Sequence, residues 1–282
     1  MKNVLIIGST STVGLALGNL LAKNYRVFYG GRKDADYYLD LYAVDLKFPE
    51  NQRFDVVIHT AADFGGNGED DMCRAEMVNA IGTFNMCRLA KKVQAKHTVI
   101  VSSLSAFYMP GDPNFNIYSL SKRHGDELAQ LYCEQFKMPL TILRPTQLYD
   151  AESRCKSHQR LFYSIIDKAS KGEDINFYGA NDALRNYLFL DDFCEIIANV
   201  LEQNIVGLFN CPASKSVRLT EVAKTAYQVF NQAGTIHFLA EKPNIVDLPD
   251  MSGSNLYNKI CFEPKISLAE GIKLIKRARE AT

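Results

Sequence analysis

The N-terminal segment that sets the architecture of this chain reads Val4-Leu5-Ile6-Ile7-Gly8-Ser9-Thr10-Ser11-Thr12-Val13-Gly14. It begins as a continuous apolar run, passes through a loop of glycine, serine and threonine, and continues as a helical pattern to Lys23. A strand that turns tightly into a helix presents the free amides of the helix N-terminus, which favour anions such as a pyrophosphate. Serine and threonine are also ordinary helix caps, so the loop alone predicts either a phosphate-binding turn or a capped helix.

The same alternation of strand and helix continues through the first half of the chain. Further apolar runs occur at Val27–Tyr29, Val56–His59, Val99–Val101 and Leu140–Leu143. Because these runs are continuous rather than alternating, they indicate parallel strands that are covered on both faces. Helical spacing lies between them, at Val13–Lys23, Glu69–Val93 and Tyr118–Lys137. The pattern predicts an α/β fold with a Rossmann-like, doubly wound parallel sheet.

The pattern changes after Pro145. The remaining helical segments are Gln159–Lys171, Asp192–Glu202, Val222–Gln232 and Leu268–Ala278, separated by loops rich in Gly, Pro and Asn. We therefore predict a dinucleotide-binding domain at residues 1–145 and a smaller substrate-binding lobe at 146–282, with some crossing of the chain between the two. Open sheets of this kind bind ligands at the carboxyl ends of their strands, where we expect the lobe to pack.

Composition excludes several classes of protein. The 282 residues are 47% hydrophobic, and 32 Lys and Arg balance 32 Asp and Glu, so no general attraction to nucleic acid or to an anionic membrane is expected. No apolar run approaches the roughly 20 residues that span a bilayer, and the N-terminal apolar run is too short for a signal peptide. We expect a cytoplasmic protein without a nucleic-acid or membrane partner.

Cysteine and histidine spacing gives no sign of a metal site. The seven cysteines are scattered without a C-x-x-C pair, and the five histidines show no ligand spacing. This pattern is typical of reduced, mostly buried thiols.

The end of the second strand bears on cofactor choice. It reads Tyr29-Gly30-Gly31-Arg32-Lys33. An acid at this point binds the ribose diol of NAD, whereas a basic side chain accommodates the 2′-phosphate of NADP. Arg32 can grip a phosphate with two hydrogen bonds, so the sequence favours NADP(H), with NAD(H) as the alternative. The competing interpretation is that Arg32 and Lys33 are a solvated loop pair.

A tyrosine and a lysine stand four residues apart in Tyr118-Ser119-Leu120-Ser121-Lys122, on one face of a predicted helix. An ammonium beside a phenol lowers the phenol pKa from about 10 toward neutrality, which makes Tyr118 a usable acid or base. The preceding strand ends in Val101-Ser102-Ser103 and brings a hydroxyl to the same sheet edge. A chance Tyr/Lys pair on the surface is the alternative, but the three features in this order are far more specific than any one.

With these motifs in place, the chain resembles the extended short-chain dehydrogenase/reductase family, in particular its nucleotide-sugar epimerases, dehydratases and 4-ketoreductases. Gly8, Ser11 and Gly14 stand where the family has three glycines, and Thr12-Val13 stands at its usual aromatic-aliphatic pair. Further matches are Asp45-Leu46, His59-Thr60-Ala61-Ala62, Asn79–Thr83, Leu143-Arg144-Pro145, Arg185–Asp192 and Phe262–Gly271.

The resemblance implies a role for each matching residue. Tyr118 is the acid/base, Lys122 lowers its pKa and holds the nicotinamide ribose, and Ser103 binds the substrate oxygen. Ser103 is chosen over Ser102 because Phe107 fits the aromatic that follows the catalytic hydroxyl; if Tyr108 is that aromatic, the register moves to Leu104. The implied cofactor contacts are Gly8, Ser11, Thr12, Val13, Gly14, Arg32, Asp45, Leu46, Ala61, Ala62, Asn79, Tyr118, Lys122 and Pro145.

The residues after Ser103 narrow the chemistry within the family. Leu104-Ser105 lacks the Asp-Glu pair of the 4,6-dehydratases, and Ser105 replaces the cysteine of the GDP-fucose type. The 4-epimerases and 4-ketoreductases remain, and Arg32 favours a ketoreductase, because a reductase draws hydride from exchangeable NADPH. The substrate is then a nucleotide-linked sugar or another small carbonyl compound. The substrate-side candidates are Asp63, Ser103, Tyr118, Thr146, Gln147 and Arg185.

Two other functions stay open. One is an NAD-dependent nucleotide-sugar 4-epimerase. The other is a non-catalytic NADP(H)-binding sensor or scaffold protein. Ser11 leaves this alternative open, because it replaces a glycine of the loop. The resemblance also implies a homodimer built on Met72–Val93 and Tyr118–Lys137.

Overall fold

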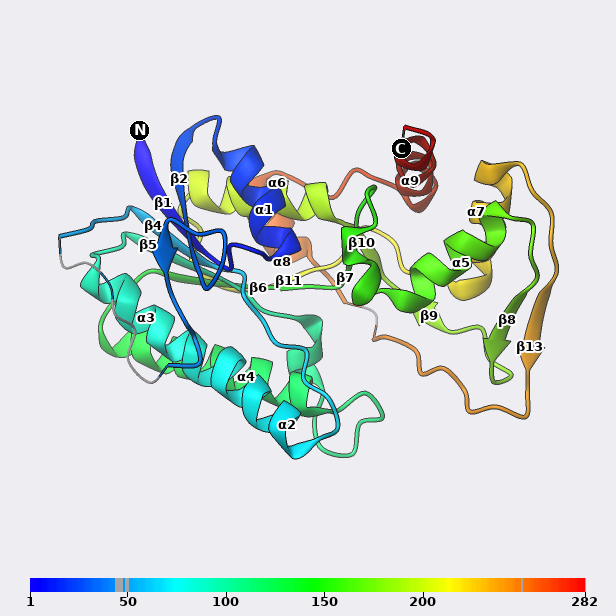
Figure 1. The fold of residues 1–282 in the computed structure, drawn as a ribbon, viewed down its shortest axis with the longest axis horizontal. Coiled ribbons are helices and arrows are strands. Elements are labelled where there is room, and N and C mark those ends of the chain that lie inside the picture. Colours follow the sequence, from blue (N-terminus) through cyan, green and yellow to red (C-terminus); the bar gives the residue numbers. More distant parts are fainter. Residues whose placement is uncertain (44–47, 49–50, 250, 282) are drawn as a thin grey trace. The chain divides into compact units, whose positions relative to one another are not determined.

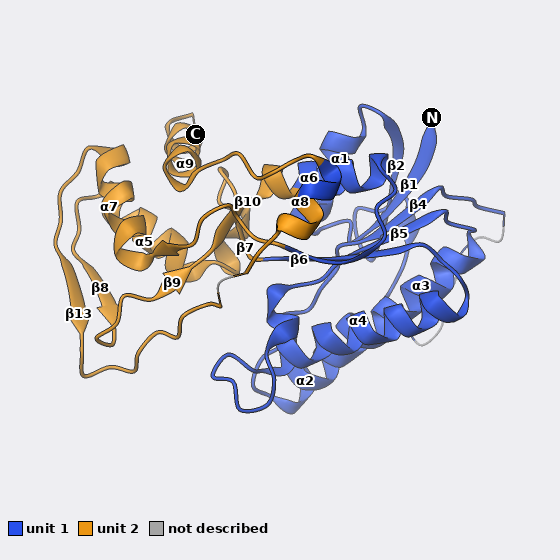
Figure 2. Ribbon diagram, turned by 180° about the vertical axis from the view of Figure 1, so that it is seen from behind, with its two compact units in different colours: residues 1–145, 194–210, 258–260 blue, residues 146–193, 211–257, 261–282 orange. Residues whose placement is uncertain are grey.

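The computed structural model describes residues 1–43, 48, 51–249 and 251–281. The chain forms two compact units, which Figure 2 shows in different colours. The first unit runs from Met1 to Pro145, and two later segments, 194–210 and 258–260, return to it. The second unit consists of residues 146–193, 211–257 and 261–282.

A seven-stranded sheet in the order β11-β6-β5-β4-β1-β2-β3 is the centre of the first unit (Figure 1). Its strands are β1 (Lys2–Ile7), β2 (Tyr25–Gly31), β3 (Tyr37–Tyr38), β4 (Val56–His59), β5 (His97–Val101), β6 (Leu140–Pro145) and β11 (Gly207–Cys211). The pairs from β3 through β6 are all parallel, and Ile6 of β1 lies between Tyr29 and Ile58. The predicted Rossmann-like fold is confirmed.

Burial explains why these segments are strands. Residues 4–7, 56–59 and 97–101 are buried without interruption, as expected for parallel strands with helices on both faces. Figure 1 shows α1 (Thr12–Leu21) and α6 (Leu190–Glu202) on one face, and α3 (Gly82–Lys92) and α4 (Ile117–Gln135) on the other. One core of the unit packs Leu5, Val57 and Ile100 of the sheet against Met86 and Ala129 of α3 and α4.

The predicted helix Glu69–Val93 is interrupted. It consists of α2 (Glu69–Ala75), a π-helical turn η1 (Glu76–Ile81) and then α3. At the turn, the Asn79 carbonyl faces α4 so closely that a Cβ on Gly125 would meet it, and the same carbonyl accepts a hydrogen bond from Thr83 Oγ1 (2.6 Å). The π-helical turn therefore occurs where η1 packs closely against α4. Helical periodicity in the sequence did not predict this turn.

The second unit has its own core. Helices α5 (Arg160–Ser170), α7 (Leu219–Phe230) and α9 (Leu268–Glu280) enclose aromatic side chains that include Phe162, Tyr163 and Phe177. Its other elements are β7 (Gln147–Tyr149), β8 (Ile175–Tyr178), β9 (Leu184–Arg185), β10 (Tyr187–Phe189), β12 (Val217–Arg218), β13 (Ile236–Leu239), the start of α8 (Ser254–Ile260) and the 3₁₀ turn η3 (Arg154–Ser157). Another 3₁₀ turn, η2 (Leu104–Phe107), belongs to the first unit. β7 pairs with β10, β9 with β12, and β8 with β13.

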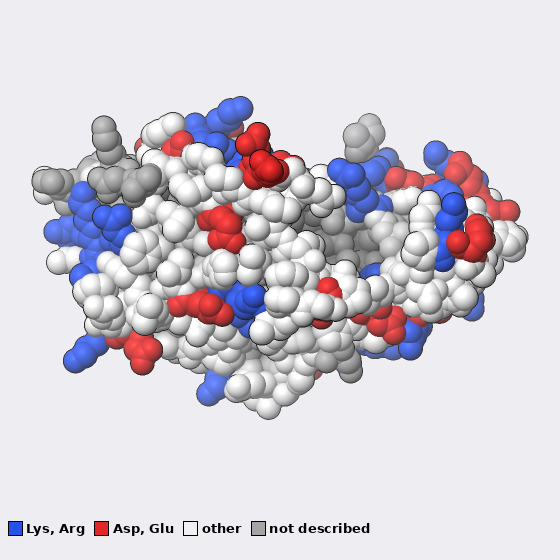
Figure 3. All heavy atoms as spheres, turned by 90° about the horizontal axis from the view of Figure 1, so that it is seen from below, with Lys and Arg blue, Asp and Glu red and all other residues white. Residues whose placement is uncertain are grey.

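The described residues also bear on membranes, metals and charge. None of their helices is both long and apolar enough to cross a membrane, and no group of three or more His, Cys, Asp or Glu is placed to hold a metal. All seven cysteines are free thiols, of which Cys73 and Cys261 are exposed. On the face drawn in Figure 3, basic and acidic side chains are interspersed rather than gathered by sign.

Candidate active site

Gly8 ends β1 at the point where the sheet order reverses between β1 and β4. Its φ is +118°, and a Cβ there would lie 2.6 Å from Thr60 Oγ1 and 2.8 Å from Ala61 N. A Cβ on Gly14 would lie 2.7 Å from the Gly8 carbonyl oxygen. The first and last glycines of the loop are therefore required by the close packing of β1, α1 and the segment after β4 at the switch point, where such sheets bind ligands.

Ser11 caps the helix that follows. Its backbone is extended, and its hydroxyl accepts a hydrogen bond from Gly14 N at 3.3 Å. The first intrahelical bond runs from Leu15 N to Ser11 O (2.9 Å), so Thr12 and Val13 stand in the first turn, where amides have no intrahelical partner. Both interpretations of the loop fit this geometry, because the cap takes one amide and leaves two that could bind an anion.

Arg32 follows β2 beside this loop. The Ser9 hydroxyl donates a hydrogen bond to the Lys33 carbonyl oxygen (2.5 Å), which fixes the segment after β2 to the glycine turn. Arg32 is exposed, and among the described residues its guanidinium has no hydrogen bond or ion pair. An exposed positive charge, without a partner in the part of the chain that the structure describes, thus stands at the position predicted to distinguish NADP from NAD. Asp45 and Leu46, the predicted adenine contacts, lie outside the described residues.

The predicted catalytic residues lie together. Ser103 follows β5 and caps η2, where its Oγ accepts a hydrogen bond from Ser105 N (3.1 Å). The Tyr118 phenol, half-buried in the first turn of α4, lies close enough to the Ser103 hydroxyl for that group to lower its pKa. One turn on, Lys122 is buried, and its Nζ donates a hydrogen bond to the Val101 carbonyl oxygen (2.9 Å).

Burial controls the protonation of this group. It raises the pKa of Tyr118 to about 12, although the nearby Ser103 hydroxyl acts in the opposite direction. Burial also lowers the pKa of Lys122 to about 8, against the pull of Asp126. The predicted lowering of the Tyr118 pKa by lysine is not seen in this structure, because desolvation of the phenolate is the largest influence and Lys122 is not among the groups that shift this pKa. At neutral pH Tyr118 carries its proton and is poised as an acid.

A buried carboxylate that sequence reasoning missed supports the lysine. Asp126 lies one turn beyond Lys122 on α4, and its Oδ2 accepts hydrogen bonds from Ser102 Oγ and Arg144 Nε, both at 2.8 Å. Burial raises the pKa of Asp126, while Arg144 and Lys122 lower it. The Ser102 hydroxyl is thus occupied by Asp126. Arg144 also lies over the Phe107 ring, 4.5 Å from its centroid. The i, i+4 spacing after Lys122 was the available signal.

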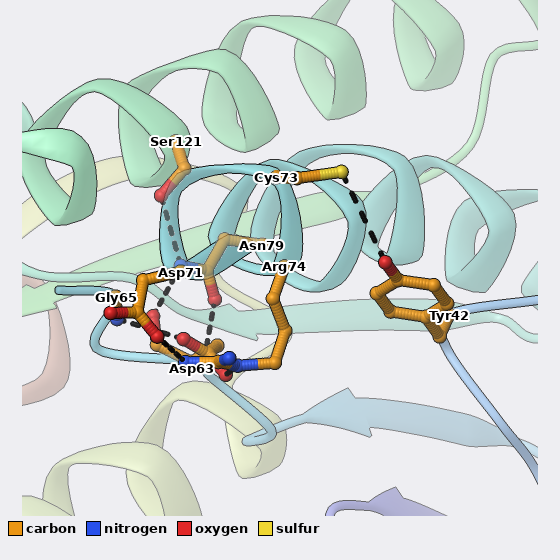
Figure 4. Close-up of polar contacts among 8 residues, drawn as sticks. All are labelled: Tyr42, Asp63, Gly65, Asp71, Cys73, Arg74, Asn79 and Ser121. Carbon is orange, nitrogen blue, oxygen red and sulfur yellow. Dashed lines mark hydrogen bonds and ion pairs between the residues drawn. The ribbon is translucent and has the colours of Figure 1, made fainter. Parts of the chain in front are cut away.

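Asn79 and Asp63 are joined to each other (Figure 4). The Asn79 side chain accepts from Asp63 N (2.8 Å) and donates to Asp63 O (2.6 Å), and its amide also reaches Ser121 Oγ at 2.9 Å. The Asp63 carboxylate accepts from Arg74 Nε at 2.7 Å, a partner that sequence reasoning missed. Asn79, a predicted cofactor contact, therefore anchors the loop after β4 to α4, and Asp63, a predicted substrate contact, is held by Arg74.

The other first-unit candidates line the same end of the sheet. Ala61 and Ala62 follow β4, where Ala61 N donates to Ile7 O at 3.1 Å. Pro145 ends β6 and is buried.

The candidates in the second unit bind their own neighbours. Thr146 Oγ1 donates to Asn186 Oδ1 (2.8 Å), and Gln147 Nε2 donates to Gln159 Oε1 (3.1 Å). Arg185 is buried, and its Nη1 donates to the carbonyl oxygens of Leu184 and Val246, each at 2.7 Å. The expected diphosphate arginine is thus engaged with the backbone of its own unit.

The first unit is a Rossmann-like sheet with a glycine turn at its switch point. A helix with a tyrosine and a lysine lies beside a serine at the end of a strand. This combination is typical of dinucleotide-binding proteins of the dehydrogenase/reductase class. A model of the NAD dependent epimerase/dehydratase family matches residues 4–211. The chain belongs to that family.

Known relatives agree with this assignment. UDP-glucuronic acid decarboxylase 1 of Arabidopsis thaliana is 28% identical over 216 residues, which are 69% of this chain and 47% of that protein. The dTDP-4-dehydro-6-deoxy-D-allose reductase of Streptomyces bikiniensis is 25% identical over 234 residues, which are 75% of this chain and 70% of that protein. The chain spans about half the length of the plant decarboxylases that it matches.

Among solved structures, the UDP-glucose 4-epimerase of Thermotoga maritima with UDP-glucose has a TM-score of 0.82 to this chain. The two chains are 17% identical, and 99% of each is covered. At that identity the likeness shows the fold alone.

Proposed function

We propose that this protein is an NADP(H)-dependent reductase of a keto group on a nucleotide-linked sugar. The observation that carries the proposal is the placing of the Tyr118 phenol beside the Ser103 hydroxyl, with the buried Lys122 one helical turn away. A carbonyl reduction needs a proton donor at the oxygen and a second hydrogen bond to it, and these two side chains supply both.

The chain has groups that fit the dinucleotide. The first-turn amides of Thr12 and Val13 would hold its pyrophosphate, Lys122 its nicotinamide ribose, and Arg32 the 2′-phosphate that marks NADP(H). When bound, the reduced nicotinamide supplies a hydride to the carbonyl carbon of the substrate. The exposed guanidinium of Arg32, which has no partner among the described residues, supports NADP(H) over NAD(H).

The protein's own residues then complete the reduction. Tyr118 gives its phenolic proton to the carbonyl oxygen as negative charge develops there, and Ser103 donates a hydrogen bond to the same oxygen. The phenolate that remains is stabilised by the nearby Lys122 ammonium, which the Val101 carbonyl holds in place. Solvent returns the proton to Tyr118 after the alcohol leaves.

The name of the Streptomyces relative supports this choice, because it describes the reduction of a dehydro sugar attached to dTDP. For this chain, the substrate class of nucleotide-linked keto sugars follows from that likeness and from membership of the family. A small carbonyl compound without a nucleotide is the other substrate class that the site could serve.

The test measures NADPH consumption with a panel of nucleotide-linked 4-keto sugars. We expect turnover that falls about 10²- to 10⁴-fold in Tyr118→Phe, while NADPH binding persists. Turnover of a nucleotide sugar without net consumption of NADPH, with NAD released when the protein is denatured, would instead identify the 4-epimerase. Binding of NADPH without turnover of any carbonyl substrate would identify the sensor, which the Ser11 cap at the middle glycine position favours.

We also propose a homodimer that pairs the α3–α4 surfaces of two copies. Leu131 of α4, Phe136 at its C-terminal end and Ile81 of the adjoining η1 are exposed. The rings of Phe84 in α3 and Tyr132 in α4 are in edge contact. An apolar surface of this kind is typical of a subunit interface. The cytoplasmic location stays a prediction.

A further inference from the structure

An exposed phenylalanine lies on the ring of the proposed catalytic tyrosine. The centroids of Phe64 and Tyr118 are 4.9 Å apart, and the ring planes are within 20° of parallel. Phe64 is 48% exposed, so burial in a core does not account for its position. Offset stacking at this distance is a favoured arrangement of two aromatic rings.

The residue before Phe64 is fixed by side chains from two helical elements. Asn79 of η1 both accepts from and donates to the Asp63 backbone (2.8 and 2.6 Å). Arg74 of α2 donates to the Asp63 carboxylate at 2.7 Å and to Asp71 Oδ1 at 2.7 Å (Figure 4). The loop is therefore attached to the α2–η1 helix through both the backbone and the side chain of one residue.

The residue after Phe64 is fixed as well. Gly65 N donates to Asp63 Oδ1 (2.8 Å), so the loop turns tightly around Phe64. Gly65 has a φ of +69°, and a Cβ there would lie 2.5 Å from the Ile117 side chain, immediately before Tyr118. Only glycine gives this turn room beside α4. The backbone on both sides of Phe64 is therefore held where its ring stacks on the Tyr118 ring.

We propose that Phe64 is a positioning residue for Tyr118, and that the Arg74–Asp63 ion pair holds Phe64 in place. The stacked ring limits rotation of the phenol and covers one of its faces, so the hydroxyl stays directed at Ser103. This inference rests on the proposed function, since it concerns how the proton donor of that reaction is aligned. Misalignment of a donor by a small distance lowers the rate of the chemical step more than it weakens binding.

The first experiment reads the ring stack without any substrate. In protein labelled with ¹³C in tyrosine rings, the Tyr118 signals are assigned by their loss in Tyr118→Phe. We expect these signals to shift in Phe64→Leu, because the ring current of Phe64 is gone, and to stay close to wild type in Phe64→Tyr. Phe238→Leu is the matched control, an exposed phenylalanine of β13 in the second unit, and should leave them unchanged.

The second experiment measures NADPH-dependent turnover in the same variants. We expect kcat of Phe64→Leu to fall roughly 10- to 100-fold with KM for NADPH unchanged, and Phe64→Tyr to restore it. Arg74→Gln should shift the Tyr118 signals and lower kcat in the same direction, by less. Lys96→Gln is its control, because it removes an exposed 2.8 Å ion pair with Asp55.

The outcomes separate the two proposals. Wild-type kcat in Phe64→Leu, or unshifted Tyr118 signals, would overturn the positioning role and leave the reductase standing. A wild-type protein that reduces no carbonyl substrate would overturn the reductase, and the positioning role with it, even where the signals show the stack.

Discussion

Lys122 Nζ is hydrogen-bonded to the carbonyl oxygen of Val101 at 2.9 Å, which ties the helix that carries Tyr118 to the end of the strand that leads to Ser103. The contact explains how a serine and a tyrosine from separate elements meet at one edge of the sheet. It also places a buried ammonium near the phenol without making it a direct partner of the phenol oxygen. Lys122 can therefore lose its charge at a pH at which Tyr118 still keeps its proton.

This separation predicts the pH profile of the proposed reductase. Burial lowers the pKa of Lys122 to about 8 and raises that of Tyr118 to about 12. As pH rises through about 8, Lys122 loses the charge that stabilises the departing phenolate, while Tyr118 keeps its proton. We expect kcat/KM, which reports on the free enzyme, to decline with a midpoint near pH 8. A profile that is flat to pH 10 would contradict the role of Lys122.

Arg32 should decide between the two dinucleotides. Replacing Arg32 with Ala removes a charge-assisted contact to the 2′-phosphate, so we expect NADPH to bind about 10- to 100-fold more weakly. NADH, which lacks that phosphate, is the internal control, and its affinity should not change. Calorimetric titration of both dinucleotides measures the ratio. Equal weakening of both would show that Arg32 supports the loop rather than reads the phosphate.

Ser11 separates the two interpretations of the glycine loop. Its hydroxyl accepts from Gly14 N, so Ser11→Ala should lower the free energy of unfolding by about 1 kcal/mol, whereas Ser11→Gly should lower it by only a few tenths. Glycine also lets a pyrophosphate approach the backbone, so we expect Ser11→Gly to bind NADPH at least as tightly as wild type. Denaturant unfolding and dinucleotide titration measure the two effects. Loss of NADPH binding in Ser11→Gly would assign the hydroxyl to the phosphate instead.

The parts of the fold that the sequence predicts are those with local signals. The run Val56–His59 is a strand over the predicted residues, because its continuous apolar side chains suit a strand that is buried on both faces. The edge strand β11 (Gly207–Cys211) was not predicted. It is only partly buried, and it joins the sheet by pairing with β6, which lies far from it in the sequence. The π turn at Asn79 was missed for the same reason, because its contacts are with α4.

The site divides in a similar way. Spacing was enough to pair Tyr118 with Lys122, because residues four apart share a helical face. The direction of the Tyr118 pKa was not predictable, since it depends on burial and on where the Lys122 ammonium points. The contacts of Phe64 with Tyr118 and of Arg74 with Asp63 join the loop after β4 to separate helices, so no local pattern reveals them.

The proposed dimer makes Leu131 a sensitive position. It lies on α4 with 65% of its surface exposed, so it contributes little to the fold of one subunit. We expect Leu131→Asp to convert a dimer into a monomer, because it places a charge in an apolar interface. Leu131→Ala should weaken the dimer less. Light scattering after size exclusion measures the mass, and a wild-type protein that is monomeric at micromolar concentration would contradict the proposal.

His59 should make the protein sensitive to acid. It is fully buried on β4, where Thr83 donates its hydroxyl proton to the Asn79 carbonyl and therefore accepts from His59 Nε2 (3.1 Å). His59 Nδ1 is buried without a hydrogen-bond partner among the described residues. Burial, and after it the charge on Lys122, lowers the pKa of His59 to about 3.

Because the folded pKa of His59 lies below the unfolded value of about 6.5, the unfolded chain binds more protons between these values, and stability falls as pH drops through this window. At pH 5 the loss from His59 alone is about 2 kcal/mol relative to pH 7. We expect His59→Gln to be less stable than wild type at pH 7 but to lose less stability on acidification, as measured by urea unfolding. His237→Gln, which changes an exposed histidine on β13, is the control and should keep the wild-type dependence on pH. A His59→Gln variant with the full acid dependence would show that another group governs it.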